Sequence, residues 1–421
     1  MNAECRKVQR VYLTLELLHT LAASFIWGIN TLFLLDAGLS NAEAFAANAF
    51  FTGGLVLFEV PTGVVADTRG RRMSYLVGTL TLAAATLLYL WMWRISAPLW
   101  AWAPASALLG LGFTFFSGAV EAWLVDALAF SGFDGKLESV FAKGEIVQGV
   151  AMLSGSVAGG AVAQATDLGV PYVLRVVVLA LTFLCAFAWM RDLGFTPSRG
   201  KRPLSELKRV LRGSIEHGLA NPPVRWVMVA GLFSGGVLIY AFYAMQPYLL
   251  ELYGDEEAYG IAGLAAAVVA GAQILGGLSV TLVGRVFRRR TTVFLAGGGA
   301  GSLILALIGL VPAFWPVLAL LVLWGLLFAA VTPVRQAYLN ELVSSEHRAT
   351  VLSFDSMLAS SGGVVVQPVL GRAADAWSYP ASYVLSAAID ALAIPFLWLA
   401  RREQAAADSI PADRVERVPP G

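Results

Sequence analysis

Long runs of apolar residues, separated by short polar segments, make up most of this chain. A helix that crosses the hydrocarbon core of a membrane needs about 20 mainly apolar residues. The runs that reach this length predict twelve transmembrane helices, at residues 11–35, 44–66, 74–94, 103–127, 140–164, 172–190, 224–250, 259–283, 292–311, 315–339, 349–373 and 380–400. The pattern therefore indicates an all-α polytopic membrane protein.

The composition excludes the water-soluble classes of protein. Of 421 residues, 58% are hydrophobic and 14% are charged, whereas ordinary soluble domains have about 25% charged residues. A disordered chain is excluded because so apolar a sequence would collapse. Cys5 and Cys185 are too few for a disulfide framework and lack metal-ligand spacing, so we expect no metal and no cofactor. A net charge of +1 provides no evidence for a nucleic-acid partner. The partner that the composition predicts is therefore the lipid bilayer.

Basic residues gather on one side of the predicted spans. If the N-terminus is cytoplasmic, all but three of the 29 Lys and Arg residues lie at or near the inner face, the exceptions being Arg94, Arg175 and Arg372. The positive-inside rule expects this asymmetry in a protein of the cytoplasmic membrane. Glu16 and His19 interrupt the first run, so we interpret it as a retained helix rather than a signal peptide. An even number of spans returns the C-terminus to the cytoplasm.

The longest polar stretch divides the twelve spans into six plus six. We predict an N-terminal six-helix bundle at 1–191, a cytoplasmic linker at 192–223, a C-terminal six-helix bundle at 224–402 and a short flexible tail at 403–421. The basic run LSELKRVLRG in the linker favours an amphipathic helix on the inner leaflet over a regulatory site.

Two short matches suggest that the six-helix unit is duplicated. Gly155–Gly160 corresponds to Gln367–Arg372, and Ala122–Asp126 corresponds to Ala337–Glu341. The offsets, 212 and 215 residues, are nearly equal.

The segment GVVADTRGRR between the second and third spans resembles the signature of the major facilitator superfamily. The matching residues are Gly63, Asp67, Gly70, Arg71 and Arg72. The equivalent loop of the second half, VTLVGRVFRRR, keeps the bases and lacks the acid, as second copies in this superfamily often do. The resemblance implies two pseudo-symmetric six-helix bundles that work as a monomer and move a small molecule.

The resemblance also implies a gate. In the family this loop locks the outward-facing form, because its aspartate meets a helix N-terminus across the domain interface and an arginine pairs with an acid on the fourth span. Asp126 is a matching acid in this sequence. We therefore expect an Asp67, Arg71 and Asp126 cluster that breaks when the inner side opens. The alternative is a static salt bridge at the inner rim.

A second, weaker resemblance concerns the direction of transport. Drug–proton antiporters of the superfamily often carry a GPxxGG motif in the fifth span, and this chain has Gly155, Gly159 and Gly160 in register with Ser156 in place of the proline. The match favours efflux by antiport. Close helix packing alone would also account for these small residues.

Four ionisable residues in the first half predict a proton relay. Glu16, Glu59 and Glu121 each lie on the order of 10 Å from the inner ends of their helices, and His19 shares a helix face with Glu16. Ionisable groups inside a membrane usually face a cavity or a partner. Alternatively, these groups neutralise one another or pair with Lys143.

The second half carries three further charges inside its spans. Arg335 and Asp355 share a depth, so we expect an ion pair. Asp390, halfway along the twelfth span, is interpreted as either a structural hydrogen-bonding group or a further proton-coupling site.

The substrate cavity is expected between the halves at mid-membrane. Polar and aromatic residues of the central spans suit an amphipathic organic molecule, although aromatic residues also serve in packing and at membrane interfaces. The candidates are Asn30, Trp123, Tyr240, Tyr243, Gln246 and Gln273.

These observations predict a secondary active transporter that exports a small organic solute in exchange for protons. The alternatives within transport are proton-coupled import and uncoupled facilitation, and a more distant one is a non-transporting membrane sensor. We do not expect an enzyme, because the three histidines supply no catalytic constellation and the sequence lacks a GxxxxGK[ST] nucleotide cradle.

Overall fold

The computed structural model describes residues 3–197, 203–344 and 347–410, which fold into helices and contain no β-strand. The N-terminal half contains α1 Ala3–Trp27, α2 Asn30–Asp36, α3 Asn41–Arg69, α4 Arg71–Arg94, α5 Leu99–Thr114, α6 Ala119–Phe130, α7 Leu137–Ala165 and α8 Gly169–Trp189. The linker contains α9 Pro203–Ser214 and the π-turn η1 Ile215–Leu219. The C-terminal half contains α10 Pro222–Tyr253, α11 Tyr259–Leu278, α12 Val280–Val286, α13 Arg290–Leu310, α14 Phe314–Leu342, α15 Arg348–Ala376, α16 Tyr379–Ala391, α17 Ala393–Arg402 and the 3-10 turn η2 Ala406–Asp408.

Each of the twelve predicted spans corresponds to one helix or one interrupted pair of helices. Among the described residues, ten helical segments are long and apolar enough to cross a membrane, and the bent pair α1–α2 makes eleven. The twelfth is α15, whose 29 residues reach across the molecule but include Arg348, Asp355, Arg372 and Asp375, which lower its mean hydropathy. The expected all-α fold is confirmed.

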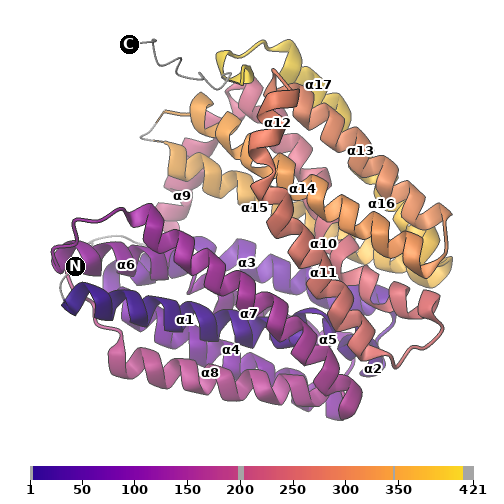
Figure 1. Ribbon diagram of the computed structural model, residues 1–421, viewed down its shortest axis with the longest axis horizontal. Coiled ribbons are helices and arrows are strands. Elements are labelled where there is room, and N and C mark those ends of the chain that lie inside the picture. Colours follow the sequence, from indigo (N-terminus) through magenta and orange to yellow (C-terminus); the bar gives the residue numbers. More distant parts are fainter. Residues whose placement is uncertain (1–2, 198–202, 345–346, 411–421) are drawn as a thin grey trace, which may run out of the picture.

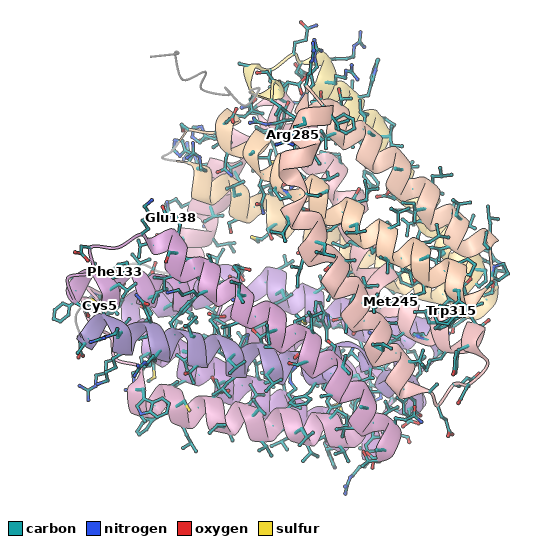
Figure 2. All side chains as sticks on the ribbon, viewed as in Figure 1. Cys5, Phe133, Glu138, Met245, Arg285 and Trp315 are labelled. Carbon is teal, nitrogen blue, oxygen red and sulfur yellow. The ribbon has the colours of Figure 1, made fainter. Side chains whose placement is uncertain are left out.

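The two halves form separate helix bundles that meet along two pairs of helices. α3 packs on α15, and α7 packs on α11. Figure 1 shows the N-terminal half from indigo to magenta and the C-terminal half from rose to yellow, with α9 between them at one end. We call the end where α1 begins and α9 lies the linker end, and the opposite end the far end. In Figure 2, Glu138 and Arg285 lie at the linker end and Trp315 at the far end.

Two spans of the N-terminal half are interrupted. The first bends by 48° between α1 and α2. The fourth is broken between α5 and α6, where Gly118 has a φ of 66°, a left-handed conformation that glycine adopts without a steric penalty. The second break places Ser117 in the turn between α5 and α6 and Glu121 in the first turn of α6.

The linker and the tail are more ordered than a solvated segment. α9 contacts both α3 and α15, and the Ser214 hydroxyl donates a hydrogen bond to the Thr350 carbonyl. Within the predicted tail, Asp408 accepts a 2.8 Å hydrogen bond from the Thr291 amide and Ala407 accepts one of 2.7 Å from Arg290. The remainder of the tail, 411–421, lies outside the described residues.

Candidate functional site

A cavity of about 660 Å³ lies between the two halves. Its walls come from α1, α3, α4, the α5–α6 break and α7 on one side and from α15 on the other. The volume falls within the range of roughly 300–1,000 Å³ that is usual for small-molecule sites.

The structure brings the four groups of the predicted relay to this one cavity. Glu16, His19, Glu59 and Glu121 all line it, although they come from three different spans. They line the same cavity because each lies at a similar depth on a helix that borders it. The sequence signal, an ionisable residue inside an apolar run, therefore identified the wall of the cavity.

Two of these carboxylates are held by neutral hydrogen-bond donors. The Gln148 side-chain amide donates to Glu16 at 2.6 Å, and the Ser117 hydroxyl donates to Glu59 at 2.6 Å. Glu121 is exposed to the cavity. Within the described part of the chain none of the three forms an ion pair, and Lys143 pairs with none of them. The predicted alternative of a Lys143 partner is therefore not observed.

His19 lies against an aromatic wall. Its ring stacks on Phe116 with centroids 4.2 Å apart and meets the edge of Phe113 at 5.9 Å. Its Nδ1 atom is buried without a hydrogen-bond partner. The ring is thus fixed in place at the edge of the acidic wall.

The wall contributed by α15 is made of hydroxyl groups. Ser353, Ser356 and Ser360 line the cavity with Met357 between them, and their spacing of three and four residues places them on one helix face. These serines were not among the predicted site residues. The SxxSxxxS pattern within the predicted span was the available signal.

The residues predicted to bind substrate lie elsewhere. None of Asn30, Trp123, Tyr240, Tyr243, Gln246 and Gln273 lines the cavity. Asn30 is buried, where it donates to Asn48 and accepts from Tyr172. The Trp123 indole donates a 2.7 Å hydrogen bond to the Arg191 carbonyl.

The four candidates in the second half also make structural contacts. The Tyr240 hydroxyl is hydrogen-bonded to Ser382 at 2.6 Å. Gln246 is fully buried and bonds the backbone of the α1–α2 break. Tyr243 meets the ring of Phe242 edge to face, and Gln273 lies beside Gly325. Aromatic and amide side chains serve packing and hydrogen bonding as often as binding, so their type alone did not locate the cavity.

Arg175 is a buried cation, and the predicted topology places it at the outer side of the membrane. It is 2% exposed, and its guanidinium donates to the Thr86 hydroxyl and lies 5.7 Å from the Phe113 ring centroid. Among the described residues it forms no ion pair. Its position as the one charge in the apolar run of α8 was the signal for an interior residue.

The predicted three-residue gate cluster is only partly assembled. Arg71 and Asp67 form an ion pair of 2.6 Å. The side chain of Asp126 makes no ion pair or hydrogen bond in the described part of the chain. A different acid, Asp192, accepts a 2.9 Å hydrogen bond from the backbone amide of Arg72 at the start of α4.

The positive φ of Gly70 explains part of this geometry. Its φ is 108°, which disfavours any other residue, and a side chain at this position would overlap the Asp192 carboxylate. Arg72 extends past it to the Phe187 carbonyl at 2.7 Å. Gly63, by contrast, has open space around it.

The C-terminal half repeats this arrangement. Asp408 accepts from the Thr291 amide at the start of α13, as Asp192 does at the start of α4. Arg290 forms a 2.5 Å ion pair with Glu341, the counterpart of Asp126. The second half therefore has the arginine–acid pair that was expected in the first.

The charges inside the C-terminal half lie apart from the cavity. Arg335 and Asp355 form an ion pair with two hydrogen bonds of 2.6 Å. Asp390 is buried and accepts a 2.8 Å hydrogen bond from Ser302. It does not line the acidic cavity.

The two halves are hydrogen-bonded to each other toward the far end. The Gln367 amide donates to the Thr52 hydroxyl at 3.1 Å, and the Gln164 side chain accepts from the Gly260 amide at 3.2 Å. At the extreme far end, the Asp375 carboxylate accepts from the amides of Asn41 and Ala42.

Comparison with solved structures gives the same architecture. The nucleoside transporter NupG superposes with a TM-score of 0.78 over 95% of this chain and 99% of that one, at 12% identity. A bacterial homologue of the human lysosomal transporter Spinster, in an inward-facing and unoccupied conformation, gives 0.75 over 98% and 100%, at 16% identity. A POT family transporter gives 0.71 over 94% and 96%, at 11% identity. At these identities the likeness shows the fold alone.

Comparison of the sequence itself gives the family. A search of curated protein sequences found no significant match. The model of the Major Facilitator Superfamily, however, matches residues 13–315 and 259–419, which together cover nearly the whole chain. With the twelve-helix fold and the cavity between its halves, this match identifies the chain as a member of the Major Facilitator Superfamily.

Proposed function

We propose that the protein exchanges protons for a small amphipathic organic cation, by alternating access through the cavity between its halves. One observation carries this proposal. Three carboxylates line the cavity, and its described lining residues include no Lys or Arg. Such a wall attracts cations and repels anions, because charges interact strongly where water is scarce.

The remaining wall suits the apolar part of such a solute. Phe113, Phe116, Met152 and Met357 line the same cavity. Aromatic faces attract organic cations, and methionine side chains adapt to ligands of different shape. The serines of α15 offer hydroxyl partners for a polar substituent on the opposite side.

Proton coupling follows from competition for the same carboxylates. A carboxylate that holds a proton no longer attracts a cation, and a bound cation disfavours protonation. By linkage, each ligand lowers the affinity for the other to the same extent. Mutual exclusion at Glu16, Glu59 and Glu121 gives antiport, which under an inward proton gradient expels the cation.

The gate of this mechanism lies at the linker end. The hydrogen bonds at the far end support an assignment of this structure to the form that is open toward the cytoplasm. In the opposite form, we propose, Asp67 meets the N-terminus of α15 and Arg71 moves to Asp126. The free carboxylate of Asp126 in the present form favours this exchange.

Import is the second candidate. The hydroxyl-lined α15 wall favours a polar solute that carries both an amine and hydroxyl groups, and the similar structures include a nucleoside transporter. A symporter would bind the proton and this solute together instead of in competition. The direction of proton movement therefore distinguishes the two.

The test uses ethidium, a permanently charged aromatic cation whose fluorescence reports its location. Inverted membrane vesicles that contain the protein are acidified inside and given the dye. Accumulation that disappears in Glu16→Gln, Glu59→Gln and Glu121→Gln supports efflux by antiport. Alkalinisation outside intact cells on addition of a solute supports symport.

A thermal-shift screen of the purified protein tests the charge of the substrate separately. Quaternary ammonium compounds are expected to raise the melting temperature, whereas carboxylates and phosphates are not. Selection of anions by the wild-type protein would contradict the proposal, whichever direction the vesicles report.

A further inference from the structure

A second cavity lies wholly within the C-terminal half. Its volume is about 250 Å³, and its walls belong to α10, α13, α14, α15 and the α16–α17 pair. It shares no lining residue with the acidic cavity. It is therefore a separate space rather than an extension of the transport pathway described above.

Most of this wall is apolar and aromatic. Phe294, Trp324 and Phe328 line the cavity. Gly298 and Gly301 of α13 also line it, and their lack of side chains leaves the space open. A wall of this kind suits a flat, apolar group such as an aryl ring.

One buried carboxylate interrupts the apolar wall. Asp390 is 8% exposed and lines the cavity. It accepts a 2.8 Å hydrogen bond from the hydroxyl of Ser302, and Ser234 lines the same cavity. Among the described residues no cation pairs with it. A carboxylate inside a membrane protein requires a compensating positive charge or a proton.

The nearby arginine does not provide that charge. Arg335 also lines the cavity, but both of its terminal nitrogens bond the two oxygens of Asp355 at 2.6 Å. This bidentate pair is electrically neutral and uses the strongest donor geometry of the guanidinium. Among the described residues, Asp390 is therefore the one lining carboxylate without a cationic partner, and its charge must be balanced by a bound cation or by a proton.

We propose that the second cavity is a binding site for a small aromatic monocation, whose ammonium group pairs with Asp390 and whose ring packs on Trp324 and Phe328. A cation supplies the charge that the buried carboxylate lacks, and an adjacent indole strengthens its binding. This binding does not depend on the transport proposed for the acidic cavity.

The probe is benzyltrimethylammonium, and its control is neopentylbenzene, the neutral hydrocarbon of the same shape. Titration calorimetry of the purified protein gives both affinities. Binding of the cation at least about 30-fold tighter is expected, the ratio that corresponds to one buried charge pair. Equal affinities would overturn the assignment of a cation site and indicate a merely apolar pocket.

Two variants locate the probe. Asp390→Asn keeps the size of the side chain and should weaken binding at the second cavity by about 30-fold or more, whereas binding of the probe in the acidic cavity should be unchanged. Gly301→Val fills the cavity beside the carboxylate, because a Cβ there would contact the Asp390 oxygen at 3.7 Å without overlap. Its matched control is Gly299→Val on the same helix, where a Cβ meets open space, and this variant should bind as the wild type does.

Charge removal in the acidic cavity completes the test. Glu59→Gln should leave the affinity for benzyltrimethylammonium at the second cavity unchanged, even if ethidium transport is lost. Loss of probe binding in Glu59→Gln with full binding in Asp390→Asn and Gly301→Val would overturn the proposal, because the probe would then occupy only the acidic cavity. Thermal melts of each variant confirm that it is folded.

Discussion

The carboxylate of Asp375, at the end of α15, accepts a 2.9 Å hydrogen bond from the backbone amide of Asn41, the first residue of α3. Its second oxygen accepts one of 2.8 Å from Ala42. A helix N-terminus carries unpaired N–H groups and a partial positive charge, so a carboxylate is favoured there. The two helices belong to different halves, and this contact therefore joins the halves at the far end. The Tyr379 hydroxyl adds a hydrogen bond to the Asn41 side chain.

We predict that Asp375→Asn weakens this closure by about 0.5–1 kcal/mol, the usual value of a charge at a helix terminus. The far end should then open roughly two- to fivefold more often. Met357 lies in the cavity wall, so labelling of a Met357→Cys variant by an impermeant maleimide added outside cells reports the opening. Arg372→Gln alters one exposed charge on the same helix and should leave the labelling rate unchanged.

Gln246 of α10 stabilises the break in the first span. Its side-chain oxygen accepts from the Thr31 amide at 2.9 Å, and its side-chain nitrogen donates to the Trp27 carbonyl at 2.8 Å. A methionine side chain is about as long as that of glutamine but makes no such hydrogen bonds. Gln246→Met therefore leaves two buried backbone groups unpaired, each at a cost of about 1–3 kcal/mol. We expect a clearly lower melting temperature in detergent. Gln273→Met, which removes an amide without a hydrogen bond in the described structure, should melt as the wild type does.

Asp192 and Asp408 make equivalent contacts in the two halves, so we predict that their removal lowers the stability by similar amounts. Asp192 and Asp408 each accept a backbone amide at the start of a helix, so their replacement by Ala should lower the free energy of unfolding by about 1 kcal/mol. Asp126→Ala should change it little, because Asp126 makes no bond here. Thermal or denaturant unfolding compares the three. An Asp126→Ala loss as large as the others would contradict the assignment.

Asp67 is expected to act in turnover rather than in folding. Asp67→Asn removes its charge while it keeps the size, so we predict that ethidium transport by inverted vesicles is suppressed and that the amount of protein in the membrane is unchanged. Binding of ethidium to the purified protein should persist, because Asp67 does not line the cavity. Normal transport by this variant would rule out the gate.

Acidification should weaken cation binding in the acidic cavity. Carboxylates lose their charge as the pH falls, and one proton displaced per cation gives at most about a tenfold loss of affinity per pH unit. Ethidium keeps its charge throughout, so its dissociation constant measured between pH 5 and pH 8 reports the protein groups alone. Glu121→Gln should reduce this slope. An unchanged affinity across the range in the wild type would exclude competition between proton and cation.

Local sequence information predicted the spans with good accuracy. The lengths of the apolar runs placed each helix within a few residues, apart from the earlier start of α1 at Ala3. An apolar run needs no knowledge of its neighbours, because the membrane is its environment. The breaks at Thr114–Ala119 and Trp27–Asn30 were not predicted. The break at Trp27–Asn30 depends on a partner far along the chain, Gln246.

Charged residues were informative in the cavity because an ionisable group inside a membrane is expensive and needs a reason to be there. The aromatic and amide candidates were less informative, since Trp123 and Tyr240 satisfy their polar groups by local packing as buried side chains do elsewhere. Serine is small and common in helices, so the SxxSxxxS pattern of α15 was a weak signal for a cavity wall.

The sequence by itself determined that this chain is a twelve-helix member of its superfamily and that a few acids lie inside its spans. Only the tertiary structure decided which acids share a cavity, that Asp192 rather than Asp126 contacts the start of α4, and that Asp390 belongs to a separate space in the C-terminal half. The physical reason is that hydropathy is a property of each segment alone. Which polar groups meet depends on the rotation and packing of whole helices, which is fixed by contacts between residues far apart in the sequence, such as Gln148 with Glu16.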